Sequence, residues 1–414
     1  TALGNVNLAG NVTGSGLFTS TGIDFTNTGS ITDAGILIDH SGNVLADGAL
    51  NGSGLNVDIN GATITTTANG TINGAAITLT SQGLVSIDGI VTGSGLFTST
   101  GTTFLNEGTG SITADGVTIN HSGNVTFHAA LDGGTGNVLV DGADITSNIA
   151  GTINGNVITL TAAGNVSLDG DVTGTGLFTS TGIDFTNNGS ITAFGVTVTH
   201  TGNVLFSGAG DGKPGDVLVQ GVNITSDSDG TINGAIITLT ATGNVGLAGD
   251  VTGSGLFTST GVNFTNTGSI TATGILIDHT GTVLADGALN GSGLNVDIDG
   301  LSITTTANGT IDGAAITLTS TTSVSIDGTV TGGGLFTSTG TTFLNEGTGS
   351  ITAAGVTIDH SGDVTFHAAI DGTTGDVLVN GADITSNSAG TINGAIITLT
   401  ATGNVDLAGN VTGS

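Results

Sequence analysis

Apolar and polar residues alternate along this chain in short runs of three to five positions. Examples are Leu55–Ile59, Ile77–Thr80 and Val138–Val140, in which every second residue is apolar. A period of two is typical of strands with one buried face, whereas the i, i+3, i+4, i+7 spacing of amphipathic helices is not sustained anywhere. The pattern therefore predicts an all-β chain of many short strands.

Each alternating run ends at residues that are typical of tight turns. Pairs of Asn or Asp with glycine follow the apolar segments, as at Asn60-Gly61, Asn73-Gly74, Asp88-Gly89 and Asp141-Gly142. Such pairs are expected to supply left-handed backbone, so each strand should end at a sharp corner.

A repeat of about 80 residues organises the strands. The string Gly-Leu-Phe-Thr-Ser-Thr-Gly recurs at intervals of 79, 81, 79 and 79 residues, with its leucine at Leu17, Leu96, Leu177, Leu256 and Leu335. The modules at Leu17 and Leu96 return at Leu256 and Leu335, both shifted by 239 residues. Each module divides into two related halves of about 40 residues and, we infer, into coils of roughly 20.

About three strands in each coil predict a right-handed parallel β-helix of about 20 coils, each of roughly 20 residues. We expect residues 1–414 to form a single continuous β-solenoid of five modules. Both ends fall inside a repeat, which favours a segment of a longer chain or a subunit of a fibre. An array of β-sandwiches is the competing interpretation, but the lack of Trp and Tyr and the finer subdivision of the repeat argue against it.

Phenylalanine pairs hold the same place in every module and are expected to be core. They are Phe18 and Phe25, Phe97 and Phe104, Phe178 and Phe185, Phe257 and Phe264, and Phe336 and Phe343. Stacked on like residues in adjacent coils, each such side chain would contribute about 1.5–3 kcal/mol through burial.

Charge narrows the possible partners. The chain has 32 acidic residues, one base, Lys213, and a formal net charge of −31. Nucleic acids and anionic membrane surfaces are bound through Lys and Arg, so both classes of partner are excluded. No apolar stretch is long enough to span a membrane, and the absence of cysteine excludes disulfides.

The chain resembles the repeat regions of large secreted bacterial exoproteins of the filamentous-haemagglutinin type. The resemblance rests on runs such as Gly-Asn-Val-Asn-Leu-Ala-Gly (4–10), Gly-Ser-Ile-Thr (29–32) and Gly-Thr-Ile-Asn-Gly (70–74). It implies an adhesive fibre that is either exposed on the cell surface or shed into the extracellular medium. The resemblance assigns no catalytic residues to this chain.

Histidine and aspartate are the candidate metal ligands, and the sequence does not assign a metal site. Five histidines share one module position, which we interpret as a copied corner residue: His40, His121, His200, His279 and His360. The other two histidines, His128 and His367, occur only in the module that begins at Leu96 and in its copy at Leu335. Calcium is more plausible at Asp-Gly corners such as Asp47, Asp132, Asp286 and Asp371, where carboxylates of neighbouring coils could share an ion.

Two other functional classes are weighed. An enzyme would need convergent carboxylates in one place, but the acidic residues are spread over every module, so we expect no catalytic site and no cofactor. Ice binding would need a continuous flat threonine array. The triplets Thr19–Thr21, Thr65–Thr67 and Thr78–Thr80 are expected on different parts of the coil, which disfavours it.

The hypothesis that emerges is a non-enzymatic extracellular fibre that provides length, stiffness and resistance to proteolysis. Open coil rims would template further coils, from the same chain or from another copy. The alternatives are an adhesin stalk that binds glycans or cell-surface receptors and, less favoured, an ice-binding solenoid. The least repetitive stretch, Gly208–Gly215 with Lys213 and Pro214, is expected to protrude and to offer a module-specific contact.

Overall fold

Short parallel strands stacked coil upon coil make up the structure, a computed structural model that describes residues 1–413. Typically, each strand pairs in parallel with the strand three places further along the chain. The chain has about 20 turns of about 20 residues each, which confirms the predicted parallel β-solenoid. Residues 1–413 contain no helix, and therefore no helix that could cross a membrane. The handedness of the coil stays a prediction.

Each coil has three faces, which the first complete module illustrates. Face 1 carries β3 (Leu17–Gly22), β6 (Gly35–His40), β9 (Val57–Gly61) and β12 (Ile77–Ser81). Face 2 carries β4 (Phe25–Asn27), β7 (Asn43–Ala46), β10 (Thr63–Thr66) and β13 (Leu84–Ile87). Face 3 carries β5 (Ser30–Asp33), β8 (Ala49–Gly52), β11 (Thr71–Gly74) and β14 (Ile90–Gly93).

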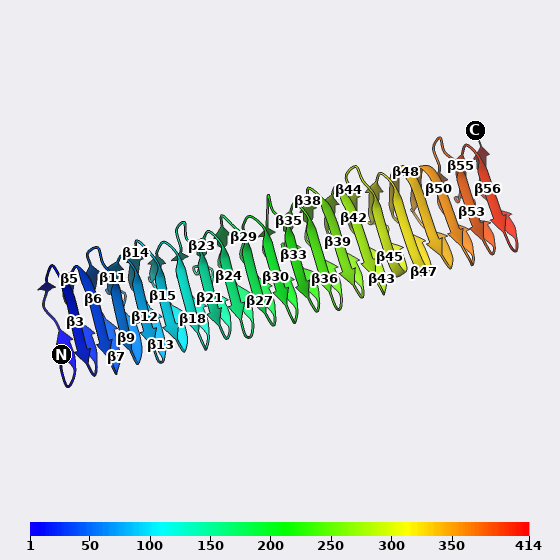
Figure 1. Ribbon diagram of the computed structural model, residues 1–414. Helices are drawn as coiled ribbons and strands as arrows, with labels where there is room; N and C mark the ends of the chain where they lie inside the picture. Colours follow the sequence, from blue (N-terminus) through cyan, green and yellow to red (C-terminus); the bar gives the residue numbers. More distant parts are fainter. Residues whose placement is uncertain (414) are drawn as a thin grey trace. The chain divides into compact units, whose positions relative to one another are not determined.

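The chain divides into two compact units. One comprises Thr1–Gly202 with Gly208–Gly212, and the other comprises Asn203–Ser207 and the chain from Lys213 onward. Within each unit the strands of successive coils lie side by side, as the ribbon shows (Figure 1). Each unit is a parallel β-solenoid, and the expected continuity of one domain over the whole chain stays a prediction.

Parallel pairing in constant register stacks like residues into ladders. On face 1 of the first unit, Phe18 pairs with Ile36, Ile36 with Val57, and Val57 with Ile77. Twelve phenylalanines are almost fully buried, including nine of the ten that form the expected pairs, and Phe18 is half-buried. The predicted phenylalanine core is therefore confirmed.

A four-coil period follows from the sizes of the stacked side chains. The inward positions of face 1 read Phe97, Ser99 and Gly101 in one coil and Val117, Ile119 and His121 in the next. Gly101 leaves room for the imidazole, because a methyl group there would lie 2.9 Å from His121 Cε1. A large residue is thus matched by a small one in the adjacent coil, so neighbouring coils cannot be identical in sequence.

Glycines line the corner between faces 2 and 3. A methyl group on Gly48 would lie 2.0 Å from the carbonyl oxygen of Gly29, and one on Gly89 would lie 1.9 Å from that of Gly70. These glycines allow the backbones of successive coils to approach closely at the corner. The left-handed backbone expected at Gly61, Gly74, Gly89 and Gly142 is wrong, because none of them has a positive φ.

Some strands in the second unit continue around a corner. They are β45 (Val296–Thr305), β47 (Ile316–Ile326), β48 (Thr329–Gly340) and β50 (Ser350–His360). The register of the β45–β47 pair shifts between Gly300 and Ser302, and that of β48–β50 shifts between Gly332 and Leu335. The bend between two faces is therefore made at glycine-containing irregularities inside one long strand.

Candidate functional site

Five buried serine–histidine pairs recur through the structure, one in each module. Each joins a face 1 serine to the Nε2 of a histidine one coil further on, at 2.9–3.0 Å: Ser20 and His40, Ser99 and His121, Ser180 and His200, Ser259 and His279, and Ser338 and His360. The serines are 0–4% exposed and the histidines 2–5% exposed.

Each imidazole is held between coils by a second contact as well. The ring centroid of His121 lies 5.4 Å from that of Phe104, and the corresponding histidine–phenylalanine pairs in the other modules lie at 5.3–5.5 Å. The Nδ1 atoms of these five histidines have no hydrogen-bond partner. The imidazole is thus packed largely as an apolar ring whose one hydrogen bond is the contact of Nε2 with the serine.

Burial lowers the pKa of His121, His200, His279 and His360 to about 4, and it also lowers that of His40. The carbonyl group of Ile183 and the carboxylate of Asp184 raise the pKa of His200, but by less than burial lowers it. These histidines are therefore neutral at physiological pH.

The pairs correct the interpretation of these histidines as corner residues. His121 ends β18 (Val117–His121) at an inward position, and its ring fills the core. A serine and a histidine at hydrogen-bond distance are also found in hydrolases, but Ser99 is 0% exposed, so its hydroxyl is not open to a substrate. The fixed separation of 20 or 22 residues between serine and histidine is the sequence signal that could have identified them.

Loss of one serine hydroxyl tests this role. We expect Ser99→Ala to lower the free energy of unfolding by about 1–3 kcal/mol, because it leaves the buried Nε2 of His121 without a partner. Urea unfolding followed by far-UV circular dichroism measures the loss. Ser122→Ala, at an exposed position in the next corner, is the matched control. Equal stability of the two variants would contradict the assignment.

A second buried polar series occurs on face 2: Asn27, Asn106, Asn187, Asn266 and Asn345. Asn27 donates from Nδ2 to the carbonyl oxygens of Gly29 and Ala49, both at 3.1 Å, so it joins two successive coils. The Oδ1 atoms of the five asparagines have no hydrogen-bond partner. The recurring asparagine two positions after phenylalanine was the available sequence signal.

The Asp-Gly corners use their carboxylates as hydrogen-bond acceptors. Asp132 accepts the backbone N–H of Gly134 at 2.9 Å, and Asp371 accepts Nδ2 of Asn393 at 3.0 Å. Asp47 and Asp286 each accept a threonine hydroxyl from the following coil. Within residues 1–413, no three acidic or histidine side chains converge as metal ligands would. Calcium binding at these corners stays a prediction, which thermal melts with and without a chelator would test.

Threonines occupy two outward rows of face 1. Thr19 and Thr21 lie on the same face as Thr78 and Thr80, so the expectation that these triplets fall on different parts of the coil is wrong for them. Thr65 lies on face 2, as expected. Leu37, Asp39, Asp58 and Asn60 interrupt the two rows. The triplets are separated by one or more coils, so their common face could not be recognised from the sequence.

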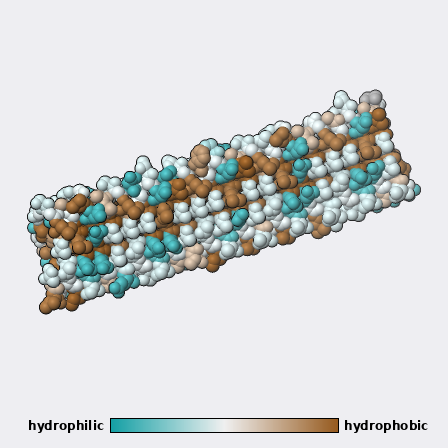
Figure 2. All heavy atoms as spheres, viewed as in Figure 1, coloured by the Kyte–Doolittle hydropathy of each residue, from teal (hydrophilic) through white to brown (hydrophobic). Residues whose placement is uncertain are grey.

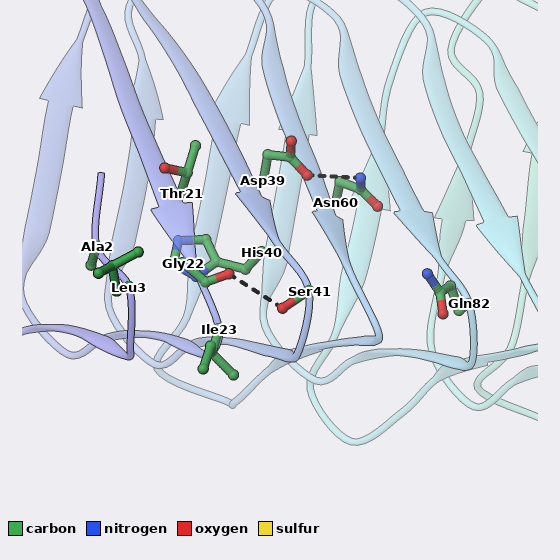
Figure 3. A pocket seen from close by; sticks show the side chains of 10 residues that line it. All are labelled: Ala2, Leu3, Thr21, Gly22, Ile23, Asp39, His40, Ser41, Asn60 and Gln82. Carbon is green, nitrogen blue, oxygen red and sulfur yellow. Dashed lines mark hydrogen bonds between the residues drawn. The ribbon is translucent and has the colours of Figure 1, made fainter.

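Two of the open grooves on the described surface are lined mainly by polar residues. One, of about 440 Å³, lies beside His40 and Gly22, where Asn60 donates to Asp39 at 2.9 Å (Figure 3). The other, of about 550 Å³, follows a row of asparagines in the second unit and is deepened by the missing side chain of Gly246. Asn223 and Asn263 already form hydrogen bonds with neighbouring coils, so the amides serve the corner itself.

The stretch Gly208–Gly215 is built into the coils more closely than expected. Gly210 and Asp211 form β32 (Gly210–Asp211), which pairs with β29 (Ile191–Thr192) in the first unit. Lys213 and Pro214 are exposed in a turn of the kind that also follows Asp132 and Asp371. The prediction of a protruding loop is therefore wrong for its first half, because those residues continue the ladder.

Comparison with known proteins adds no assignment to these features. No protein-family model, curated protein or solved structure matches the chain.

Proposed function

We propose that this chain is a non-enzymatic structural fibre that acts outside the cell and provides length, stiffness and resistance to proteolysis. The observation that supports it is the repetition of one core in every module, with its buried phenylalanines, serine–histidine pair and buried asparagine. Such a design adds length without changing the cross-section, and its stability is approximately a sum over neighbouring coils.

Self-association is part of this proposal. Within each unit, every coil is held to the next by the same parallel main-chain pairing. The same pairing can add a coil at an open rim, from the same chain or from another copy. Electron micrographs of the purified chain test this, with long uniform threads as the expected result. Separate short particles at all concentrations would contradict it.

Proteolysis tests the protective role of the fold. Chymotrypsin cleaves mainly after aromatic residues, which enter its hydrophobic specificity pocket. Phe194 is 57% exposed, whereas twelve phenylalanines are almost fully buried. We expect the native chain to be cut at most near Phe194, and the heat-unfolded chain to be degraded extensively. Fragment masses measured over a time course distinguish the two. Rapid cleavage of the native chain at several buried phenylalanines would contradict the proposal.

The resemblance to exoproteins of the filamentous-haemagglutinin type suggests a second role for the same fold. In that role the chain is the stalk of a bacterial surface adhesin, and the stalk itself binds glycans or receptors. Binding of the purified chain to a glycan array, with heat-unfolded chain as the control, separates this role from a purely mechanical one.

A further inference from the structure

A shallow apolar cleft lies at the corner where face 3 leads into face 1. In the second unit, it lies between Leu256, which is 44% exposed, and Leu294, which is 56% exposed. Its volume is about 310 Å³. Gly274 contributes to its floor, since a methyl group there would lie 3.4 Å from Leu256 Cδ1 and 3.5 Å from Leu294 Cβ. Two leucines separated by a residue without a side chain thus form the cleft.

The first unit contains the same set of residues. Leu17 and Leu55 are 60% and 56% exposed, and a methyl group on Gly35 would lie 3.2 Å from Leu17 Cδ1 and 3.3 Å from Leu55 Cβ. Every residue that lines the cleft in the second unit has a residue of the same type 239 positions earlier. Hydrophobic residues also form interrupted rows on the face shown in Figure 2.

Phe194 is the one exposed phenylalanine among residues 1–413. It lies two residues before Val196, which pairs with Phe178 as Ile275 pairs with Phe257. Phe194 therefore occupies the equivalent corner of its own coil, at the position where other modules carry smaller or polar residues: Ala34, Asp115, Thr273 and Ala354. An apolar ring at this position has no role in the core of its own coil.

We propose that two copies of this chain associate laterally, with Phe194 of one copy inserted into the leucine cleft of another. A cavity of about 150 Å³ accommodates benzene, so a cleft of about 310 Å³ has room for a phenyl ring. Asp297, at the rim of the cleft, is compatible with the positive edge of an aromatic ring. Each copy carries both a ring and clefts, so a contact that uses the ring of one copy and the cleft of another leaves the other ring and clefts free for further copies.

The net negative charge of the chain determines the ionic strength at which this contact can form. Each copy carries a formal net charge of −31, so two copies repel each other at low ionic strength. Salt screens this repulsion without weakening the apolar contact. We expect lateral association to increase between 0.05 and 0.5 M NaCl, on the order of the range in which the Debye length falls below 10 Å.

Sedimentation velocity over a concentration series in 0.5 M NaCl tests the proposal. We expect Phe194→Ala, and the double variant Leu55→Ser/Leu294→Ser, each to weaken association at least about tenfold, since 1.4 kcal/mol corresponds to a factor of ten. The substituted side chains are exposed, so the variants should fold, and their circular dichroism melts check this. Ile149→Ala and Leu335→Ser, at exposed positions away from the two-leucine clefts, are the matched controls.

Mixing the two variants gives the decisive result. The Phe194→Ala chain keeps its clefts and the double leucine variant keeps its ring, so the mixture should form complexes that neither forms alone. End-to-end growth would persist in both variants, which separates this contact from the proposed fibre growth. Undiminished association of the Phe194→Ala chain, or a mixture that sediments as its separate components, would overturn the proposal.

Discussion

Acidification is expected to destabilise this protein steeply between pH 6.5 and 4. Four buried histidines have a pKa of about 4 in the folded chain, against an ordinary value of 6.5, and that of His40 is also lowered. In this window the unfolded chain binds protons that the folded chain does not. The contribution of the neutral imidazoles is therefore complete above pH 6.5 and is lost as the pH falls.

The expected loss of stability on acidification is large because all five buried histidines contribute to it with the same sign. Each of His121, His200, His279 and His360 should lower the free energy of unfolding of its region by about 1.4 kcal/mol for each pH unit, or about 3 kcal/mol over the whole window. Protonation of the acidic surface relieves repulsion and acts in the opposite direction. The comparison must therefore be made between variants rather than on the natural chain alone.

A chain with glutamine in place of all five buried histidines isolates the effect. Glutamine keeps a hydrogen-bonding group near the serine but does not titrate in this range. Urea unfolding from pH 7.5 to 5, followed by far-UV circular dichroism, should show a much flatter pH dependence in this variant. His128→Gln, at an exposed position, is the control and should leave the pH dependence unchanged. Parallel curves for the natural chain and the five-site variant would contradict the expectation.

Substitution of a corner glycine is the second change expected to have a large effect. In Gly89→Ala the new methyl group would lie 1.9 Å from the carbonyl oxygen of Gly70 and 2.7 Å from that of Thr67. Both obstacles are backbone atoms, so the coils must separate. The 3.1 Å hydrogen bond from the Ile90 N–H to the Gly70 carbonyl would then be strained. We expect a loss of at least about 3 kcal/mol, the upper end of the usual cost of overpacking.

Gly246→Ala is the matched control for this substitution. Gly246 faces outward on β37 (Val245–Leu247), where a methyl group would meet only Thr225 Cγ2, at 3.8 Å. Alanine there should be neutral or stabilise by up to about 1 kcal/mol, because it restricts the unfolded chain. Chemical unfolding of both variants under identical conditions measures the difference. Similar losses in both would mean that glycine is needed for strand conformation in general and not for close approach at the corner.

The sequence alone was sufficient to predict strands, corners and coil length. Alternation in segments such as Ile77–Thr80 marks one buried face, and the following glycine marks the corner, because both are local properties of the backbone. The recurrence of the phenylalanine pairs predicted their burial, since large apolar residues at the same place in every module are expected in the core. These features depend on neighbouring residues or on a period that can be counted.

Contacts between coils could not be predicted in the same way. Ser99 binds His121 over 22 residues, whereas Ser180 binds His200 over 20, because the intervening corners differ in length. A shift of one residue moves a side chain from the core to the surface, so the partner of a given residue depends on the conformation of every corner between them. For the same reason, the shared face of Thr21 and Thr80 and the leucine clefts were found only in the structure.

The sequence by itself thus determined that this protein is a repetitive β-solenoid with an apolar core, since local alternation and a constant period specify both. Only the tertiary structure decided that the repeated histidines are buried and neutral, that corner glycines bring coils together, that one phenylalanine is left exposed, and that pairs of leucines form surface clefts. The physical reason is that burial and close approach depend on the register between coils, which the folded backbone sets.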